Sequence, residues 1–589
     1  MKQFFKFMLA SMTGCLFTFI IIFIFLFILI SSISSFSKKE VVVVSENTVL
    51  SLTFDQPIFD RTSNNPFENI DFATFKATNL IGLNDIIKNI RKAKTDNRIK
   101  GIYLDLSTID AGIATVEEIR NALIDFKKSK KFIISYGEVY TQKAYYLASV
   151  SDKIYMNPEG ILDFKGLNAQ VMFIKGALQK LEIEPQVIRH GKYKSAIEPL
   201  ILDKMSDASK EQTLTFINSI WEVMIKNISE SRNISITELN DIADSLKTQN
   251  PEDAVNCKLI DKLMYKDEVL SDLRYRLGIK ENKKINMISL LKYKDVPENL
   301  KPKHSKNKIA VIFATGDIIS GEGDERSIGS EKLSETIRDA RNDSSIKAIV
   351  LRINSPGGSA LASEVIWREV YLTSKIKPIV ASMGDVAASG GYYIACAANK
   401  IIASPNTITG SIGVFGILPN MKGLFNNKLG ITFDNVKTNK YADLGDISRP
   451  LNESEMLVIQ NSIERIYKTF ITHVADGRKM TIAQIDSIGQ GRVWSGLDAK
   501  RIGLIDDFGG LDKAIVLAAS FAKLDNYKLI DLPKQKDPFS QIVEQLTGNV
   551  KINLISNELG DGYKYYEYIK SLTKMSGVQA RLPYNIDIY

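Results

Sequence analysis

The sequence has few of the residues from which disulfide frameworks and metal sites are built. Its 589 residues include 3 cysteines (Cys15, Cys257 and Cys396) and 3 histidines. The cysteines form no CxxC pair and no HExxH motif occurs, which argues against a disulfide-stapled domain, a zinc ribbon and a histidine-built metal site. We therefore expect no metal centre.

A dense basic block is also missing. The 76 basic residues exceed the 68 acidic ones by only 8, and no Lys/Arg cluster is interleaved with aromatic residues. Nucleic acid is therefore not an expected partner. The length of 589 residues is more than one hydrophobic core accommodates, so we expect at least two domains.

Charge is absent from one long segment near the N-terminus. No charged residue occurs from Phe7 to Ser37, and Leu16 to Ile30 is apolar except for Thr18. About 20 such residues cross a hydrocarbon core, so residues 7–37 are predicted to contact membrane lipid as a single-pass anchor in a segment 1–40. Lysines flank both ends of the run, so the charge distribution leaves the orientation open. No second run of comparable length occurs, which places the rest of the chain on one side.

The rest of the chain repeats itself at an offset of 247 positions. Residues 98–104 align with 345–351, and 9 of the 24 positions in Ser135–Pro158 are identical to those in Ser382–Pro405. The repeat predicts two homologous domains, residues 41–295 and 309–589. Between them, residues 296–308 (VPENLKPKHSKNK) have the composition of a linker.

Each half alternates β-branched runs with helical patterns. In the second half we expect strands at 346–353 and 378–384 and helices at 360–375 and 389–398. This alternation predicts an α/β fold with a largely parallel, covered sheet. Sites in such sheets lie beyond the carboxyl ends of the strands, where the loops carry glycine and small polar residues.

Two loops of the second half have the residues that acyl transfer requires. In Asn354–Ser359 (NSPGGS), two glycines let backbone N–H groups face a cavity, as an oxyanion hole needs, although a tight turn would also use glycine. In Gly384–Tyr392 (GDVAASGGY), Ser389 precedes two glycines at a predicted helix start. Ser389 is therefore a candidate nucleophile, and a helix N-cap is the structural alternative.

The two halves differ at these places in a complementary way. The first half has Gln142-Lys143-Ala144 opposite the serine and Ile109-Asp110-Ala111 opposite the glycines. Conversely, Lys194 of the first half corresponds to Ala442 of the second. A serine needs a base, and a buried lysine can act as one. His473 is the alternative base, although a helix histidine more often packs, and Lys194 could equally be a surface lysine.

In combination, these motifs resemble the signal peptide peptidase A (protease IV) family in its long tandem-domain form. The resemblance covers nearly all of the chain and includes an N-terminal anchor, GKYKSAIEP at 191–199, NSPGGS at 354–359, GDVAASGGYYIA at 384–395, TGSIGVFG at 409–416 and GRVWSGLDA at 491–499. It implies two tandem ClpP/crotonase-like domains behind a transmembrane helix, and a serine peptidase that uses a Ser/Lys dyad.

The resemblance also assigns roles to individual residues. The family's nucleophile matches Ser389, its general base Lys194, its oxyanion donors the backbone of Gly358 and Gly390, and its lysine-orienting serine Ser411. No cofactor is required. The implied substrates are cleaved signal peptides and other short or unfolded segments, and the implied assembly is a homo-oligomer, a tetramer, on the bacterial inner membrane with its catalytic part outside the cytoplasm.

Two alternatives to this function remain. One is a catalytically inactive, membrane-anchored scaffold of the same fold, in which the glycine loops are turns and Lys194 is solvated. The other is a crotonase-type acyl-CoA enzyme, whose oxyanion glycines look alike but which would give no role to a serine and a lysine on different halves.

Overall fold

The computed structural model of the chain describes residues 2–36, 42–65, 70–71, 76–77, 80–297, 305–536, 577–582 and 587–588. The first helix, α1, spans Lys2–Phe36. Counted over the described residues, no helix meets the length and apolarity that a membrane crossing requires. The predicted span at residues 7–37 therefore stays a prediction, and Ser37 itself lies outside the described residues.

The first half is built on a six-stranded parallel sheet in the order β10-β1-β4-β5-β6-β9. Its strands are β1 (Thr48–Leu52), β4 (Ile99–Asp105), β5 (Phe132–Tyr140), β6 (Lys153–Leu162), β9 (Lys262–Leu263) and β10 (Asn286–Ser289). Its helices are α2 (Leu83–Thr95), α3 (Ile113–Lys127), α4 (Gln142–Ala148), α5 (Lys175–Lys180), α6 (Glu198–Ile201), α7 (Asp207–Arg232), α8 (Ile236–Asp244), α9 (Pro251–Asn256), α10 (Lys266–Leu277) and α11 (Leu290–Lys294), with a 3₁₀ turn, η1, at Ser195–Ile197. Two short pairs, β2 (Ile70–Asp71) with β3 (Lys76–Ala77) and β7 (Ala169–Gln170) with β24 (Asp587–Ile588), lie outside this sheet.

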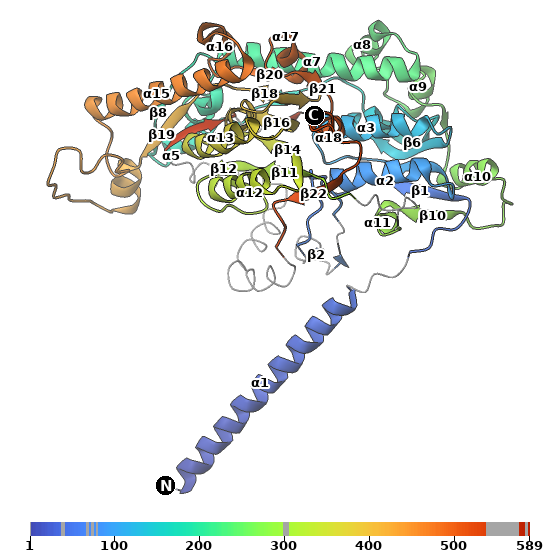
Figure 1. Ribbon diagram of the computed structural model, residues 1–589, viewed down its shortest axis with the longest axis horizontal. Coiled ribbons are helices and arrows are strands. Elements are labelled where there is room, and N and C mark those ends of the chain that lie inside the picture. The colour runs from blue at the N-terminus through green and yellow to red at the C-terminus, as the bar shows by residue number, and fades with distance from the viewer. Residues whose placement is uncertain are drawn as a thin grey trace.

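The second half has an eight-stranded sheet in the order β20-β18-β16-β14-β11-β22, with β17 paired to β16 and β21 paired to β17. Its strands are β11 (Lys308–Thr315), β14 (Ile346–Ser355), β16 (Ile379–Ala388), β17 (Lys400–Ala403), β18 (Ile408–Gly410), β20 (Val493–Ser495), β21 (Asp507–Phe508) and β22 (Lys528–Leu532). Its helices are α12 (Ser330–Asn342), α13 (Ala360–Ser374), α14 (Gly390–Ala395), α15 (Glu453–Arg478), α16 (Ile482–Ile488), α17 (Gly496–Arg501) and α18 (Leu511–Phe521), with a π-helical turn, η2, at Leu424–Leu429. The two halves lie side by side (Figure 1).

The structure repeats as the sequence does. The pairs β4/β14, β5/β16, β6/β17 and α3/α13 each start 247 positions apart, and α7 and α15 start 246 apart. The predicted α/β alternation is confirmed. The strand expected at 378–384 continues to Ala388, and the helix expected at 389–398 is the shorter α14, which leaves Ser389 in the connection between them.

The central strands are apolar because both faces of the sheet are covered. In β14, every residue from Ala348 to Ile353 is buried. Its Ile349, Leu351 and Ile353 pack on one side, and Ala348 and Val350 pack in a separate cluster that includes α18. Near-continuous β-branched and small apolar residues are typical of parallel strands buried on both faces.

A third, smaller sheet joins the halves, in the order β13-β12-β15-β23-β19-β8. Its strands are β13 (Ser327–Gly329), β12 (Asp317–Ile319), β15 (Gly357–Ser359), β23 (Val578–Arg581), β19 (Phe415–Asn420) and β8 (Glu184–Arg189). The first-half strand β8 pairs antiparallel with β19 of the second half, from Arg189 opposite Phe415 to Glu184 opposite Asn420. Residues 298–304 of the predicted linker lie outside the described residues.

A buried ion network also links the halves. Arg352 on β14 is wholly buried, and its guanidinium lies 2.7 Å from both Asp60 Oδ1 and Glu118 Oε1 of the first half. Burial acts to lower the pKa of Arg352, but the two carboxylates outweigh it and the pKa is raised. Nearby, Asp385 on β16 accepts hydrogen bonds from Thr115 N (2.8 Å) and Thr115 Oγ1 (2.6 Å) of α3. The strand that leads to Ser389 is thus fixed by a first-half helix.

Candidate active site

Ser389 stands at the sharp turn between β16 and α14. Its backbone has φ 53° and ψ −110°, a conformation that non-glycine residues rarely adopt and that costs about 1–3 kcal/mol. The turn is held by hydrogen bonds from Ser389 N to Gly410 O (2.8 Å) and from Tyr393 N to Ser389 O (2.8 Å). Although Ser389 occupies the N-cap position of α14, its side chain makes no capping hydrogen bond. Capping therefore does not explain this serine.

Lys194 reaches Ser389 from the other half of the chain. Its Nζ lies 2.9 Å from Ser389 Oγ, 3.0 Å from Ser411 Oγ and 3.2 Å from Ser411 O. All three residues are wholly buried (0% exposed). Burial lowers the pKa of Lys194 well below its usual value of 10.5. The surface-lysine alternative is therefore wrong.

The pocket around Lys194 is formed by glycines and one aromatic ring of the second half. A Cβ on Gly491 would lie 2.7 Å from Lys194 N, Cα and Cβ, and one on Gly413 would lie 3.3 Å from Lys194 Cδ. The Phe415 ring centroid is 5.8 Å from Nζ. Because these glycines have no side chains, the first-half segment packs directly onto the backbone of the second half.

The glycine loop meets the start of α14. Gly357 has φ 99° and would place a Cβ 2.7 Å from Gly390 N, so the loop and the first residue of the helix are in contact. Gly390 is the first helical residue, and its N–H has no acceptor within the helix. Gly358 is the next residue in β15, opposite Ile318 of β12 on one side and Ala580 of β23 on the other.

His473 is not part of this group. Its ring stacks on Trp367 at 3.4 Å between centroids, and its Nε2 lies 3.1 Å from Glu364 Oε2. Lys194 and Gly413, not His473, are the side-chain hydrogen-bond partners of Ser389 within the described residues. His473 is thus the packed helix histidine that the sequence pattern favoured.

Gln212 on α7 is a residue of the site that sequence reasoning missed. Its Nε2 donates to Tyr193 O (3.1 Å) and Ser195 Oγ (2.9 Å), on either side of Lys194, and its Oε1 accepts from Val493 N (3.1 Å) of the second half. One amide thereby ties the lysine-bearing loop to the other half. The sequence offers no signal for this, because a buried glutamine within a 26-residue helix belongs to no motif.

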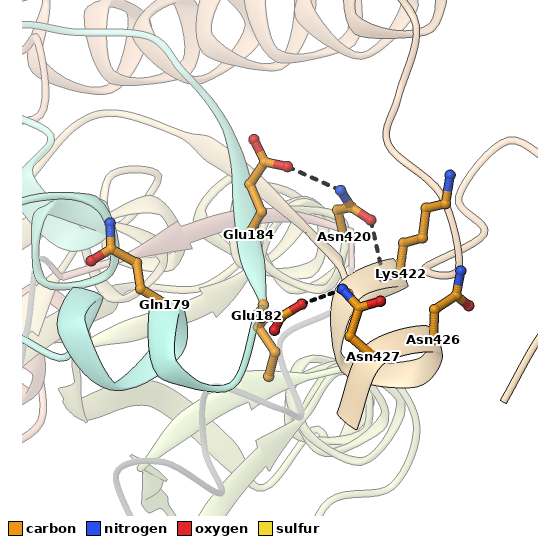
Figure 2. Close-up of a pocket in the computed structure, with 9 residues that line it drawn as sticks. Gln179, Glu182, Glu184, Asn420, Lys422, Asn426 and Asn427 are labelled. Carbon is orange, nitrogen blue, oxygen red and sulfur yellow. Dashed lines mark hydrogen bonds between the residues drawn. The ribbon is translucent and has the colours of Figure 1, made fainter. Parts of the chain in front are cut away.

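A cavity of about 450 Å³ lies at the other end of the β8–β19 pair (Figure 2). It is polar: Asn427 Nδ2 donates to Glu182 Oε2 (2.6 Å) and Asn420 Nδ2 donates to Glu184 Oε2 (2.9 Å). Its lining does not include Ser389 or Lys194. Within the described ranges, no three His, Cys, Asp or Glu side chains are close enough to hold a metal ion.

Comparison with known proteins agrees with the repeat. Peptidase family S49 matches residues 125–280 and 372–525, two segments that start 247 positions apart and together cover just over half of the chain. The chain belongs to peptidase family S49. It is a serine peptidase with two tandem family domains, which confirms the resemblance to protease IV.

Two relatives extend the similarity over most of the chain. "Protease 4" of Salmonella typhi is 40% identical over 480 residues, which cover 80% of this chain and 77% of the relative. "Serine protease SPPA, chloroplastic" of Arabidopsis thaliana is 35% identical over 508 residues, covering 85% and 74%. Among solved structures, ClpP1 from Listeria monocytogenes matches 34% of this chain and 91% of its own, with 17% identity and a TM-score of 0.22.

Proposed function

We propose that this serine peptidase is a membrane-anchored endopeptidase in which Ser389 is the nucleophile and Lys194 the general base. The observation that carries the proposal is a wholly buried lysine whose Nζ lies 2.9 Å from the hydroxyl of a serine on a strained turn. Its substrates would be cleaved signal peptides and other short or unfolded segments, as in the family that the sequence resembles.

The contacts of Lys194 suit a neutral amine. A neutral amine has two N–H donors and one lone pair, whereas an ammonium has three donors and no acceptor. Nζ is within donor distance of Ser389 Oγ, Ser411 Oγ and Ser411 O, and the Ser389 hydroxyl donates to Gly413 O. In the neutral amine, Ser411 O and Ser411 Oγ would accept the two N–H groups, and the Ser389 hydroxyl would turn from Gly413 O to the lone pair. Ser411 would thereby orient the base. Since burial is what lowers the pKa of Lys194, no neighbouring cation is needed to keep the amine neutral.

The proposed reaction follows from these positions. Neutral Lys194 takes the proton of Ser389 while Oγ attacks a peptide carbonyl carbon, and the carbonyl oxygen becomes an oxyanion. The N–H groups of Gly358 and Gly390 would stabilise that charge. The lysine then returns the proton to the leaving amine, and a water molecule, deprotonated by the same lysine, hydrolyses the acyl-enzyme. No cofactor enters any step.

The test uses the full chain in detergent and two readouts. In the wild type, we expect a fluorophosphonate probe to label Ser389 and a peptide ester to be hydrolysed. In Ser389→Ala, we expect neither labelling nor hydrolysis. The matched control is Ser404→Ala, which changes another buried serine of the second half; the Ser404 hydroxyl donates to Glu117 rather than contacting Lys194. An unlabelled wild type would favour the inactive scaffold, and turnover by Ser389→Ala would remove Ser389 as nucleophile.

We also propose the domain and membrane arrangement expected from the sequence. Residues 1–40 would form an anchor in the bacterial inner membrane, with two ClpP/crotonase-like domains (41–295 and 309–589), joined by 296–308, outside the cytoplasm. What supports the anchor is the charge-free run from Phe7 to Ser37. What supports the domains is the repeated order of strands and helices.

Self-association is the last part of the proposal, and the repeat supports it. By an offset of 248, residues 432–437 correspond to β8, yet they form no strand and are exposed. The counterpart of β19 in the first half contains β7. Within the described residues β7 has one neighbouring strand, β24, where β19 has two. If residues 432–437 of one copy paired with β7 of the next, the β8–β19 pairing would recur between copies and the copies would form a ring. The family resemblance implies that this ring is a tetramer.

A further inference from the structure

The six strands of the first-half sheet are all parallel, so their amino ends lie along one edge of the sheet. With neighbouring strands about 4.8 Å apart, this amino edge is about 24 Å long. The chain that follows α1 enters the domain at this edge, because residues 42–47 lead directly into β1 (Figure 1). The residues between Phe36 and Val42 span at most about 20 Å, so α1 ends within about that distance of the amino edge.

The five segments that lead into the other strands carry the positive charge of the chain. Together they contain 12 basic and 4 acidic residues. This excess of 8 equals the excess of the whole chain, so the remaining residues include as many acidic as basic side chains. The segments are residues 96–100, 127–132, 151–154, 258–262 and 280–286, which end in the first residues of β4, β5, β6, β9 and β10.

The second half shows that the fold does not require this charge. Its strands β14, β16, β17, β21 and β22 occupy the places of β4, β5, β6, β9 and β10 in the order of the sheet. The corresponding segments contain 6 basic and 4 acidic residues, an excess of only 2. They are residues 343–347, 374–379, 398–401, 503–507 and 522–528.

Several lysines of the amino edge have no structural role in the fold. Lys127 and Lys128 lie at the C-terminal end of α3, where the helix dipole favours cations. Lys100, Lys262 and Lys284 follow no helix end in this way, and all three are exposed. Among the residues that the structure describes, none of these three lysines forms an ion pair. Their charges are therefore available to an anionic partner.

The second half is attached at the opposite edge of this sheet. α3 begins where β4 ends, and Thr115 in its first turn donates to Asp385, four residues before Ser389. From there α3 runs back towards the amino edge over 15 residues, which is about 22 Å. A partner can therefore bind the amino edge without contacting the candidate active site.

We propose that the amino edge of the first-half sheet docks on the anionic phospholipid headgroups of the membrane that holds the anchor. The proposal rests on the membrane anchor of the proposed function. Each basic residue near an anionic leaflet strengthens binding about fivefold. The short connection to α1 makes this docking intramolecular, so weak individual attractions are sufficient. Docking would turn the first half towards the lipid and hold Ser389 roughly 20 Å from the headgroups.

The test measures how readily an amine-reactive ester acylates individual lysines of the full chain in lipid nanodiscs, with mass spectrometry as the readout. Discs of phosphatidylcholine are compared with discs of an equimolar mixture of phosphatidylcholine and phosphatidylglycerol. We expect acylation of Lys100, Lys262 and Lys284 to fall about fivefold in the mixed discs. It should recover at about 1 M salt, where the Debye length is about 3 Å.

The second half provides an internal control in the same samples. Lys347, Lys523 and Lys528 are exposed lysines of its corresponding segments. We expect them to react equally in both kinds of disc. Equal acylation of the amino-edge lysines in the two discs would overturn the proposal. Equal protection of both sets of lysines would also overturn it, because the lipid would then attract the protein without selecting this edge.

Neutralising the edge provides a second measurement. In Lys100→Gln/Lys262→Gln/Lys284→Gln, three attractions of about fivefold each are removed, so docking should weaken roughly 10²-fold. The protection of Lys130 and Lys283 in mixed discs should then disappear. Persistence of that protection would contradict the proposal.

The matched variant is Lys347→Gln/Lys523→Gln/Lys528→Gln, which removes the same charge from the second half and should keep the protection. Failure of the chain to enter discs of either kind would refute the anchor and with it the docking. A chain that enters the discs with unprotected lysines would refute the docking alone. Protection by heparin in phosphatidylcholine discs, without protection by phosphatidylglycerol, would assign the edge to a soluble polyanion instead.

Discussion

Gly491 packs against the backbone of Lys194, so replacing it tests whether the position of the lysine controls the reaction. A Cβ at Gly491 would lie 2.7 Å from Lys194 N, Cα and Cβ. Carbon atoms in contact stay about 3.5–4.0 Å apart, so Gly491→Ala must push the Lys194 segment away by roughly 1 Å. A misplacement of about 1 Å in a reacting group costs roughly 10²-fold in rate. We expect kcat/KM for a peptide ester to fall by about that factor.

The left-handed backbone of Gly491 adds a conformational cost to the alanine variant, and a second glycine with the same backbone conformation serves as the control for it. Gly491 has φ 79°, and Gly503 has φ 82°, where the nearest atom to an added Cβ would be Met480 Sδ at 3.6 Å. Both alanine variants therefore cost about 1–2 kcal/mol from the left-handed backbone, and only Gly491→Ala adds the clash. Ester hydrolysis and urea unfolding of both variants check this. Equal catalytic efficiency in the two would refute the reasoning.

Three further predictions concern the buried charges. Lys194→Arg should lose about 10⁴-fold or more in ester hydrolysis, because a guanidinium stays protonated; substantial activity would exclude the lysine as base. Since burial lowers the pKa of Lys194, the unfolded chain binds more protons than the folded one between that lowered pKa and 10.5, so stability should rise with pH across this window. The value of kcat/KM should rise as the pH passes through the lowered pKa and level off above it. Urea unfolding and rate profiles against pH measure this, and a falling stability would contradict it. Arg352→Met should lower the free energy of unfolding by about 3–5 kcal/mol, because Asp60 and Glu118 would stay buried without a counter-charge. An unchanged urea midpoint would show that this ion network does not contribute to the free energy of unfolding.

The repeat made most of the architecture predictable. An offset of 247 is visible in the sequence because buried strands and the turns after them constrain which residues fit, and the same offset relates β4 to β14 and α3 to α13. The ends of elements were less predictable. β16 continues to Ala388 because its last three residues pair with β18, and the local sequence pattern does not predict this pairing.

The candidate site was predictable to the extent that the two halves could be compared. Ser389 and Lys194 were found because each lacks a counterpart in the other half, and the structure brings their side chains to 2.9 Å. Gln212 and β23 were not predicted. Gln212 contacts two main-chain atoms and the Ser195 hydroxyl, and Ala580 reaches Gly390 across 190 positions of chain, so neither produces a local sequence pattern.

The burial that would make Lys194 a usable base under the proposed mechanism involves the half that does not contain it. Gly413, Phe415 and Gly491 belong to the second half, so docking of the halves and desolvation of the amine are one event. Loosening this contact should therefore raise the pKa of Lys194 towards 10.5 without touching a reacting group. Gln212→Ala removes the amide that ties the lysine loop to Val493, and its kcat/KM profile should shift to higher pH with activity regained in alkaline buffer. A loss of activity that is equal at every pH would mean that Gln212 only stabilises the fold.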